Sequence, residues 1–400
     1  MQSTTSHAAL RHEPETLALS HLALITFGRL GLTTAFRIIY PLLPFLSQRL
    51  QISLETVSML VTVQVLASFA SPLGGTLADT RGARTTMSIA FVLFSVGALC
   101  CALLDSFAGF LVGYALIGLA IALYQPAAQS YLSARTPYER RGMVLGIYEL
   151  SWATSALLGV APLMQLVQAT NSVALVYWTL LAVALVSLAA IRWVLPALER
   201  RSAGVSQQIA WGVLRQPRVV ALLGMLVLIL CATDLVFVVQ SEWLQRSFNA
   251  DAAQLGQVFA FMGIAEFIGA LSSTLLVDRV GKKRAVVTGY ALTALAAALL
   301  PLSGESWLMV LALFVVYDLL FEFSIVSTFP LASELAPTAR GTVLALAGTA
   351  VGAGRALGAT FAGLLFNAFG MFANGWLAAA LIAAGLLLCI RFVHEHQHET

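Results

Sequence analysis

Eight charged side chains interrupt stretches of sequence that are otherwise apolar and long enough to cross a lipid bilayer. Three are arginines and five are carboxylates: Arg29, Arg37, Glu149, Asp234, Glu266, Asp318, Glu322 and Arg355. A charge near the bilayer centre costs about 2.5–3.5 kcal/mol on insertion scales, so each one requires a partner, a water-filled cavity or a proton. Even if every arginine pairs with one carboxylate, two carboxylates are left without a cationic side chain.

Asp318 and Glu322 are the strongest candidates for binding a proton. They lie four residues apart and so share one helical face, where two negative charges oppose each other's ionisation. The alternative is a structural ion pair in which Arg355 neutralises one of them. Asp234 lies in the middle of its own apolar stretch, and we expect it to contact a substrate or a proton.

Arg29 and Arg37 are candidates for recognising an anion. They are eight residues apart, about 80° of helical rotation, so both can face one broad sector of the helix. One could pair with Glu149, while the other could bind an anionic substrate, because a guanidinium group matches a carboxylate or phosphate. The alternative for each is an interhelical ion pair or a side chain that extends to the membrane surface, and for Arg37 this alternative is favoured.

Aromatic and amide side chains near these charges are candidates for a cavity wall. They are Tyr124, Gln125, Trp152, Phe237, Tyr317 and Phe321. Aromatic rings bind apolar and cationic ligands. In membrane bundles, however, an aromatic side chain more often packs against neighbours or anchors a helix at the interface.

A bundle of membrane-spanning helices must position these residues. Of the 400 residues, 59% are hydrophobic, and apolar runs repeatedly reach the roughly 20 residues that a membrane span requires. Glycine, proline and charge clusters separate twelve such runs, which predicts an all-α membrane protein. The predicted helices are 19–46, 54–78, 85–104, 107–133, 142–167, 173–195, 218–243, 253–277, 285–302, 306–333, 342–367 and 371–391.

Several function classes are excluded by the composition. The net charge of +3 is dispersed, without the dense basic stripe of a nucleic-acid surface. The four cysteines lie in apolar runs without metal-ligand spacing, and we interpret the histidines at 394, 396 and 398 as part of a solvated tail. We therefore predict no metal, no cofactor and no enzymatic activity, since no nucleophile constellation is present either.

Lysine and arginine are distributed unevenly between the predicted loops. Seventeen of the 22 lie on one side of the membrane, Arg49 and Arg246 lie on the other, and three lie inside helices. Positively charged loops resist translocation, so both termini are predicted to be cytoplasmic, in agreement with an even number of spans. The predicted segments are a cytoplasmic tail (1–18), an N-terminal six-helix bundle (19–195), a cytoplasmic linker (196–217), a C-terminal six-helix bundle (218–393) and a second cytoplasmic tail (394–400).

Two motifs recur at one spacing in the two halves. "LADTRGAR" at 77–84 recurs as "LVDRVGKKR" at 276–284, and "RRGMVLG" at 140–146 recurs as "ARGTVLA" at 339–345, both with an offset of 199 residues. Two matches at the same offset indicate a duplicated six-helix unit, a plan common among secondary transporters.

The loop motif after the second helix resembles that of the major facilitator superfamily, as does its second copy after the eighth helix. The matching residues are Gly75, Asp79, Arg81, Gly82 and Arg84 in the first copy and Asp278, Arg279, Gly281 and Lys282 in the second. "P-x-x-x-R-G" at 137–142 is also similar to the family. The sequence departs from the family pattern at Thr80, Ala83 and Thr274.

The resemblance implies two pseudo-symmetric six-helix bundles with a central cavity lined by helices 1, 4, 7 and 10. It also implies that Asp79 contacts the cytoplasmic end of helix 11, where a helix N-terminus carries partial positive charge. We therefore predict that Asp79 latches the cytoplasmic side shut in the outward-facing state, and that Arg81 and Arg84 fix the topology and could also join this latch.

The chain is thus expected to be a secondary transporter in a bacterial cytoplasmic membrane, similar to drug/proton-antiporter-like efflux permeases. The favoured function is proton-coupled efflux of a small amphipathic or cationic compound by a monomer. Two departures from the antiporters of the superfamily weigh against antiport: Val160 follows Gly159 where they have proline, and Tyr114 stands where they have arginine. The alternatives are transport of an organic anion, such as a carboxylate, sugar phosphate or lysolipid, and a non-transporting membrane sensor or scaffold.

Overall fold

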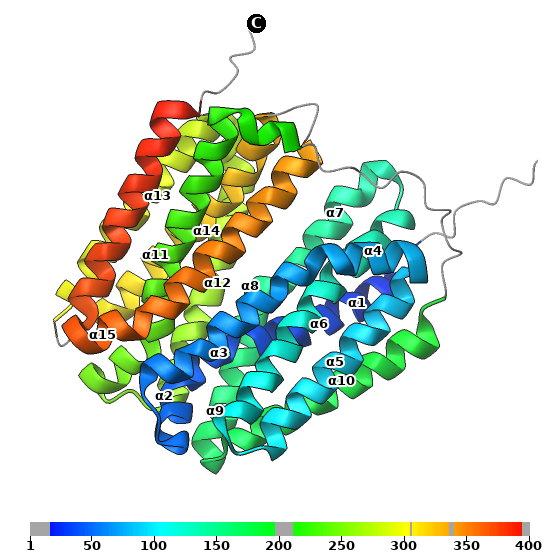
Figure 1. Ribbon diagram of the computed structural model, residues 1–400, viewed down its shortest axis with the longest axis horizontal. Coiled ribbons are helices and arrows are strands. Elements are labelled where there is room, and N and C mark those ends of the chain that lie inside the picture. The colour runs from blue at the N-terminus through cyan, green and yellow to red at the C-terminus, as the bar shows by residue number, and fades with distance from the viewer. Residues whose placement is uncertain (1–16, 197–210, 305, 336–339, 394–400) are drawn as a thin grey trace, which may run out of the picture.

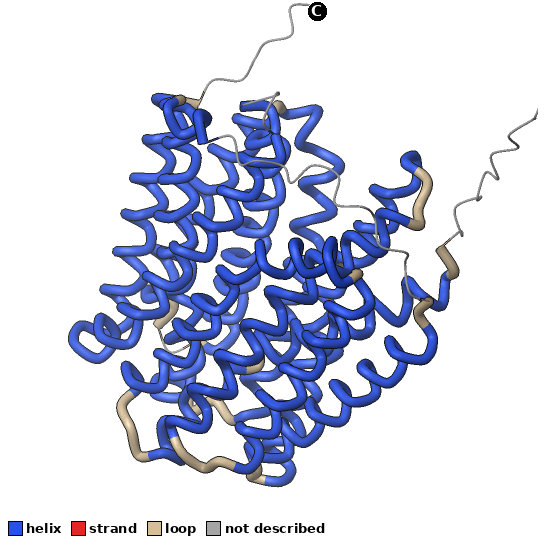
Figure 2. Tube along the Cα trace, turned by 45° about the vertical axis from the view of Figure 1, so that its right-hand side comes forward, coloured by secondary structure: helices blue, strands red, loops and turns tan. Residues whose placement is uncertain are grey.

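The computed structural model describes residues 17–196, 211–304, 306–335 and 340–393, and all of its regular elements are helices (Figures 1 and 2). Most of both predicted tails, the three histidines of the C-terminal tail and residues 197–210 of the predicted linker lie outside the described residues.

Six spans form the first half of the chain. The first two are bent, and the fifth contains a π-helical turn, so several helices are needed to describe them. They are α1 (Leu19–Arg37) with α2 (Ile39–Leu50); α3 (Leu54–Ala67) with η1 (Ser68–Ala70) and α4 (Ser71–Arg81); α5 (Ala83–Leu103); α6 (Phe107–Ala134); α7 (Tyr138–Glu149) with α8 (Ser151–Ser155), η2 (Ala156–Val160) and α9 (Ala161–Thr170); and α10 (Val173–Val194).

The second half supplies the other six spans. They are preceded by the short turn η3 (Trp211–Arg215) and consist of α11 (Pro217–Phe248), α12 (Ala252–Val280), α13 (Lys282–Leu299) with η4 (Leu300–Leu302), α14 (Trp307–Leu335) and α15 (Arg340–Phe392). The last of these contains two spans, because the chain reverses at Gly370, which has φ 72° and ψ −172°. Figure 1 shows this reversal as a hairpin of orange and red helix. The predicted twelve-helix fold is therefore confirmed.

The bend in the first span has an identifiable cause. The axes of α1 and α2 differ by 44°, and the break falls at Ile38. Pro41 has no N–H to donate to the carbonyl of Arg37 four residues earlier, and its ring crowds that carbonyl. The bend therefore places Arg37 where the helical hydrogen-bond ladder is interrupted.

The internal repeat is visible in the backbone. Gly82 and Gly281, 199 residues apart, have nearly the same dihedral angles, φ 91° and ψ 143° against φ 93° and ψ 134°. Only glycine adopts this region without strain. In both halves a basic side chain in the first turn of the following helix reaches the end of the last helix: Arg84 donates to the carbonyl of Arg192, and Lys283 donates to that of Ile390.

The two halves meet at one side of the molecule. We name the side that holds both described chain ends the terminal side; on the opposite side the helices turn near 51, 105, 171, 250, 304 and 370. Near the opposite side, α11 contacts α2, α15 contacts α3, and α12 contacts α9. Near the terminal side, α4 packs on α5, α6 and η1, and α7 packs on α1, α6 and α8, all within the N-terminal half (Figure 1).

Small residues make the contact between the halves close. A Cβ atom on Gly263 of α12 would lie 2.7 Å from the carbonyl oxygen of Ala153, and one on Gly363 of α15 would lie 3.0 Å from the Cα of Glu55. By contrast, Cβ atoms on Gly146 and Gly348, nearer the terminal side, would meet nothing within 4 Å. Among these described glycines, the close approaches to the backbone of the other half therefore lie away from the terminal side.

Candidate functional site

Arg37 and Glu266 form a buried ion pair that joins the two halves. The Nη1 atom lies 2.6 Å from Oε2 and the Nη2 atom 2.7 Å from Oε1, and each side chain is only 6% exposed. Nη1 also donates to the carbonyl of Trp152, whose ring centre lies 5.1 Å from the guanidinium carbon. A two-pronged pair of this kind fixes both distance and orientation between α1 and α12.

Arg29 is held within the N-terminal half. Its Nη2 lies 2.5 Å from Oε2 of Glu149, its Nη1 donates to the carbonyl of Tyr148, and its guanidinium carbon lies 4.1 Å from the centre of the Tyr148 ring. Gln129 donates to the other oxygen of Glu149. The predicted pairing of one helix-1 arginine with Glu149 is therefore the arrangement found.

Arg355 links the halves a second time. It lies 3.3 Å from Oδ1 of the fully buried Asp234, and its Nη2 donates to the Tyr40 hydroxyl at 2.7 Å. The α11 and α15 helices approach closely here, because a Cβ atom on Gly358 would lie 2.9 Å from the Cβ of Asp234. Arg355 therefore neutralises Asp234, and the alternative in which it neutralises Asp318 or Glu322 is wrong.

Within the described residues, Asp318 and Glu322 are the two intramembrane carboxylates that form no ion pair with an arginine. Both oxygens of Asp318 are buried and have no hydrogen-bond partner within the part of the chain described. Electrostatic interactions connect the pair to Glu266 and Arg37. Close packing explains this proximity, since a Cβ atom on Gly269 of α12 would lie 3.1 Å from the Cβ of Glu322. The four groups form one cluster between α1, α12 and α14.

The aromatic candidates divide into two groups. Phe237 meets Tyr317 and Phe321 edge to face, with ring centres 5.8 and 6.4 Å apart, so these three rings lie beside the acidic residues of α14. Trp152 lies under Arg37 and packs against Phe36.

The other two candidates for a cavity wall lie on α6. Tyr124 is buried against Phe91 and donates to the carbonyl of Ile25, so its side chain packs inside the N-terminal half. Gln125 is exposed and lies one helical turn before Gln129, on the face that reaches Glu149.

Polar residues that the sequence reasoning missed close the opposite side. Asn367 donates to Glu55 of the other half at 3.0 Å and accepts from Arg246 at 3.4 Å, while Gln48 and Gln245 are 3.4 Å apart across the same seam. These residues lie at the ends of apolar runs, where polar side chains are ordinary. Their only sequence signal is that they fall at matching depths of different helices.

The loop motif lies at the terminal side, away from the acidic cluster. Asp79 and Arg81 are exposed, and Asp79 makes no hydrogen bond or ion pair among the described residues. A Cβ atom on Gly75 would meet nothing within 4 Å, and Arg279 is exposed. The side chain of Asp278 and residues 336–339 before α15 lie outside the described part of the chain.

Three basic residues of the motif region act within their own halves. Arg84 binds the end of α10, Lys283 binds the end of α15, and Lys282 pairs with Glu334 of α14. Carbonyl groups at a helix C-terminus lack intrahelical partners and attract such cations. In this structure Arg84 caps the end of α10, and its part in the predicted latch stays a prediction.

Comparisons with known proteins agree with this architecture. The Major Facilitator Superfamily family model matches residues 25–239 and 222–400, so both halves resemble it. An MFS-type transporter of Bacillus subtilis (strain 168), YwfA, is 23% identical over 386 residues, which cover 95% of this chain and 92% of the relative.

Solved structures share the fold at low sequence identity. A D-xylose-proton symporter aligns with a TM-score of 0.80 and 16% identity, covering 95% of this chain and 99% of that one. A peptide transporter in complex with sulfate aligns with a TM-score of 0.78 and 12% identity, covering 94% and 96%. Together with the duplicated six-helix plan, the family match shows that the chain belongs to the major facilitator superfamily, whose members are membrane transporters and not enzymes.

Proposed function

We propose that this protein is a proton-coupled secondary transporter that exports a small amphipathic or cationic compound by alternating access. The observation that carries the proposal is the set of pairings inside the membrane. Each of the three arginines engages one carboxylate, and Asp318 and Glu322 are left with no cationic partner of their own. Intramembrane carboxylates of this kind mark proton relays.

A proton on Asp318 is the simplest way to account for its surroundings. An ionised carboxylate with both oxygens buried and without a hydrogen bond would bear a large desolvation cost. The neutral, protonated group avoids that cost. Release of the proton would create a carboxylate that competes with Glu266 for Arg37, and because the Arg37–Glu266 pair joins the halves, this exchange would alter how they pack.

The asymmetric seam supports alternating access. The halves contact each other near the opposite side and separate towards the terminal side, which carries the excess of lysine and arginine. With the terminal side in the cytoplasm, as the positive charge favours, this state opens to the cytoplasm. In a bacterial inner membrane, an exporter would bind its substrate in this state.

The residues around the acidic cluster favour a cationic or amphipathic substrate over an anion. Phe237, which is only partly buried, packs on the buried rings of Tyr317 and Phe321. These two rings neighbour the carboxyl groups of Asp318 and Glu322 in the sequence, and aromatic rings favour cationic ligands. Anion transport would depend on Arg29 or Arg37, and both are occupied by carboxylates. The fold itself is compatible with coupling, since a structural neighbour is described as a D-xylose-proton symporter.

A substrate panel in proteoliposomes tests the proposal. Vesicles that contain a pH-sensitive dye would be exposed to amphipathic cations and to organic anions, with Asp318→Asn, Glu322→Gln and the surface control Asp105→Asn beside the wild type. We expect a cation-dependent proton flux that Asp105→Asn retains and the other two lose. Wild-type proton flux in both Asp318→Asn and Glu322→Gln would refute the proposal.

A further inference from the structure

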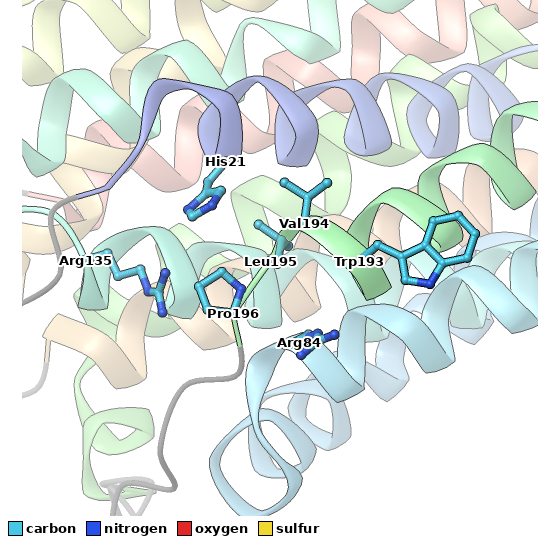
Figure 3. Close-up of a pocket in the computed structure, with 7 residues that line it drawn as sticks. All are labelled: His21, Arg84, Arg135, Trp193, Val194, Leu195 and Pro196. Atoms are coloured by element: carbon cyan, nitrogen blue, oxygen red, sulfur yellow. The ribbon is translucent and has the colours of Figure 1, made fainter.

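A basic pocket lies at the terminal side of the N-terminal half, outside the acidic cluster. Its volume is about 670 Å³, and Figure 3 shows its seven lining residues: His21, Arg84, Arg135, Trp193, Val194, Leu195 and Pro196. They come from the start of α1, the start of α5, the end of α6 and the end of α10. None of these seven residues is acidic: Arg84, Arg135 and His21 are basic, and the other four are apolar.

The two arginines are held in place by the surrounding fold. Arg135 is 5% exposed, and its guanidinium carbon lies 4.7 Å from the centre of the Tyr131 ring. Its backbone carbonyl accepts from Leu17, which fixes the start of α1 beside it. Arg84 donates to the carbonyl of Arg192 at the end of α10. The positive charges are therefore positioned by packing and do not project freely from the surface.

The position of Arg84 strengthens the positive potential of the pocket. It lies in the first turn of α5, where the helix dipole already contributes partial positive charge and a cation is disfavoured. An anion in the pocket would be attracted both by the Arg84 guanidinium and by the positive end of the α5 dipole.

The duplicated half provides an internal comparison. With the offset of 199 residues, Arg84 corresponds to Lys283, which forms the same helix-end contact, but Arg135 corresponds to Glu334. Glu334 pairs with Lys282, so the C-terminal half has a carboxylate at the position where the N-terminal half has a buried arginine. Packing alone therefore does not require two arginines at this place in the fold.

We propose that this pocket binds the phosphate-bearing headgroup of an anionic phospholipid. The pocket lies at helix ends, at the depth expected for a lipid headgroup. It is beside Trp193, which is 84% exposed, and tryptophan commonly anchors helices at the lipid interface. Guanidinium groups match phosphate oxygens, and Val194, Leu195 and Pro196 offer an apolar wall to the first carbons of the lipid. Basic pockets between membrane helices on the cytoplasmic side are suited to such headgroups.

Native mass spectrometry of the full chain tests this assignment. The delipidated protein would be titrated with phosphatidylglycerol, with phosphatidylcholine and with inorganic phosphate. We expect tighter binding of phosphatidylglycerol than of phosphatidylcholine, and Arg135→Gln and Arg84→Gln should each weaken it by about fivefold, the equivalent of about 1 kcal/mol per arginine. Arg391→Gln, the same change on the same side of the other half, should leave it unchanged.

One further variant and two contrary outcomes make the test decisive. Arg135→Lys, which retains the charge and tests folding, should retain most of the preference for phosphatidylglycerol. Equal weakening by Arg391→Gln would show general surface attraction and overturn the site. If inorganic phosphate displaced the lipid completely, the pocket would be a site for a free anion, and the lipid assignment would be overturned. Both outcomes are independent of the transport assay.

Discussion

At the scale of single residues, the interior of this transporter is organised by which carboxylate each arginine engages. Arg29 engages its own half, whereas Arg37 and Arg355 reach across to the other half. The two cross-half arginines thus stabilise a particular arrangement of the halves. Our proposal gives the proton-binding role to two other carboxylates, Asp318 and Glu322.

The first prediction concerns the Arg37–Glu266 pair. Arg37→Gln should destabilise the protein by about 3–5 kcal/mol, because it leaves a buried carboxylate without its partner. The double variant Arg37→Gln with Glu266→Gln should recover much of this loss. Thermal unfolding in detergent measures both.

The surface pair Arg49–Asp105 supplies the control for this cycle. Its side chains are 35% and 58% exposed, so Arg49→Gln should cost at most about 1 kcal/mol. If Arg37→Gln cost no more than Arg49→Gln, the buried pair would not have the structural role assigned to it.

The sequence predicted that two carboxylates would be left without an arginine, and it predicted the pairing of a helix-1 arginine with Glu149, but it did not predict the partners of Arg37 and Arg355. Counting three arginines against five carboxylates required only the sequence. The contact of Arg37 with Glu266 joins residues 229 positions apart, and no local spacing indicates it. The contact of Asn367 with Glu55 was not predicted for the same reason, because it depends on how the two halves dock.

At the scale of elements, the loop motif is explained by backbone geometry as well as by charge. Gly82 and Gly281 join consecutive spans with a positive φ, and the basic residues two positions later hold the ends of α10 and α15. The twelve spans and the repeat were predicted correctly, because long apolar runs and turn residues are local signals. The bend of the first span was not predicted although Pro41 is a local cause of it, and neither the bend of the second span nor the π-helical turn of the fifth was predicted.

The second prediction tests this backbone requirement. Gly82→Ala and Gly281→Ala should each destabilise the protein by about 1–3 kcal/mol, because a Cβ atom strains a backbone held at φ near 90°. Gly146→Ala is the matched control, since this glycine is helical and has open space around it. We expect no loss of stability there. Equal unfolding midpoints for all three variants would contradict the role given to the motif glycines.

At the scale of the whole molecule, the structure corresponds to one of the two states that our proposal of alternating access requires. The opposite side is closed by backbone contacts at Gly263 and Gly363 and by the polar contact of Asn367 with Glu55. At the terminal side the two halves are separated, and Asp79 is exposed there. The predicted latch would therefore form in the other state, when the terminal ends of the halves meet.

The third prediction concerns this latch. Asp79→Asn should leave the present state intact and reduce the population in which the terminal side is closed. Spin labels at Thr76→Cys in α4 and Thr349→Cys in α15, in a background without the native cysteines, would report the distance between the halves. We expect loss of the short-distance population in Asp79→Asn but not in Asp105→Asn. An unchanged distance distribution would remove Asp79 from the gate.

The central claim is that the unpaired acidic residues of α14 carry the transported proton. Its most direct test compares substrate exchange with accumulation driven by a pH gradient, measured in the same proteoliposomes for the wild type and Asp318→Asn. The account predicts that Asp318→Asn still exchanges substrate across the membrane but no longer accumulates it when a pH gradient is applied. Accumulation at the wild-type level in Asp318→Asn would contradict it.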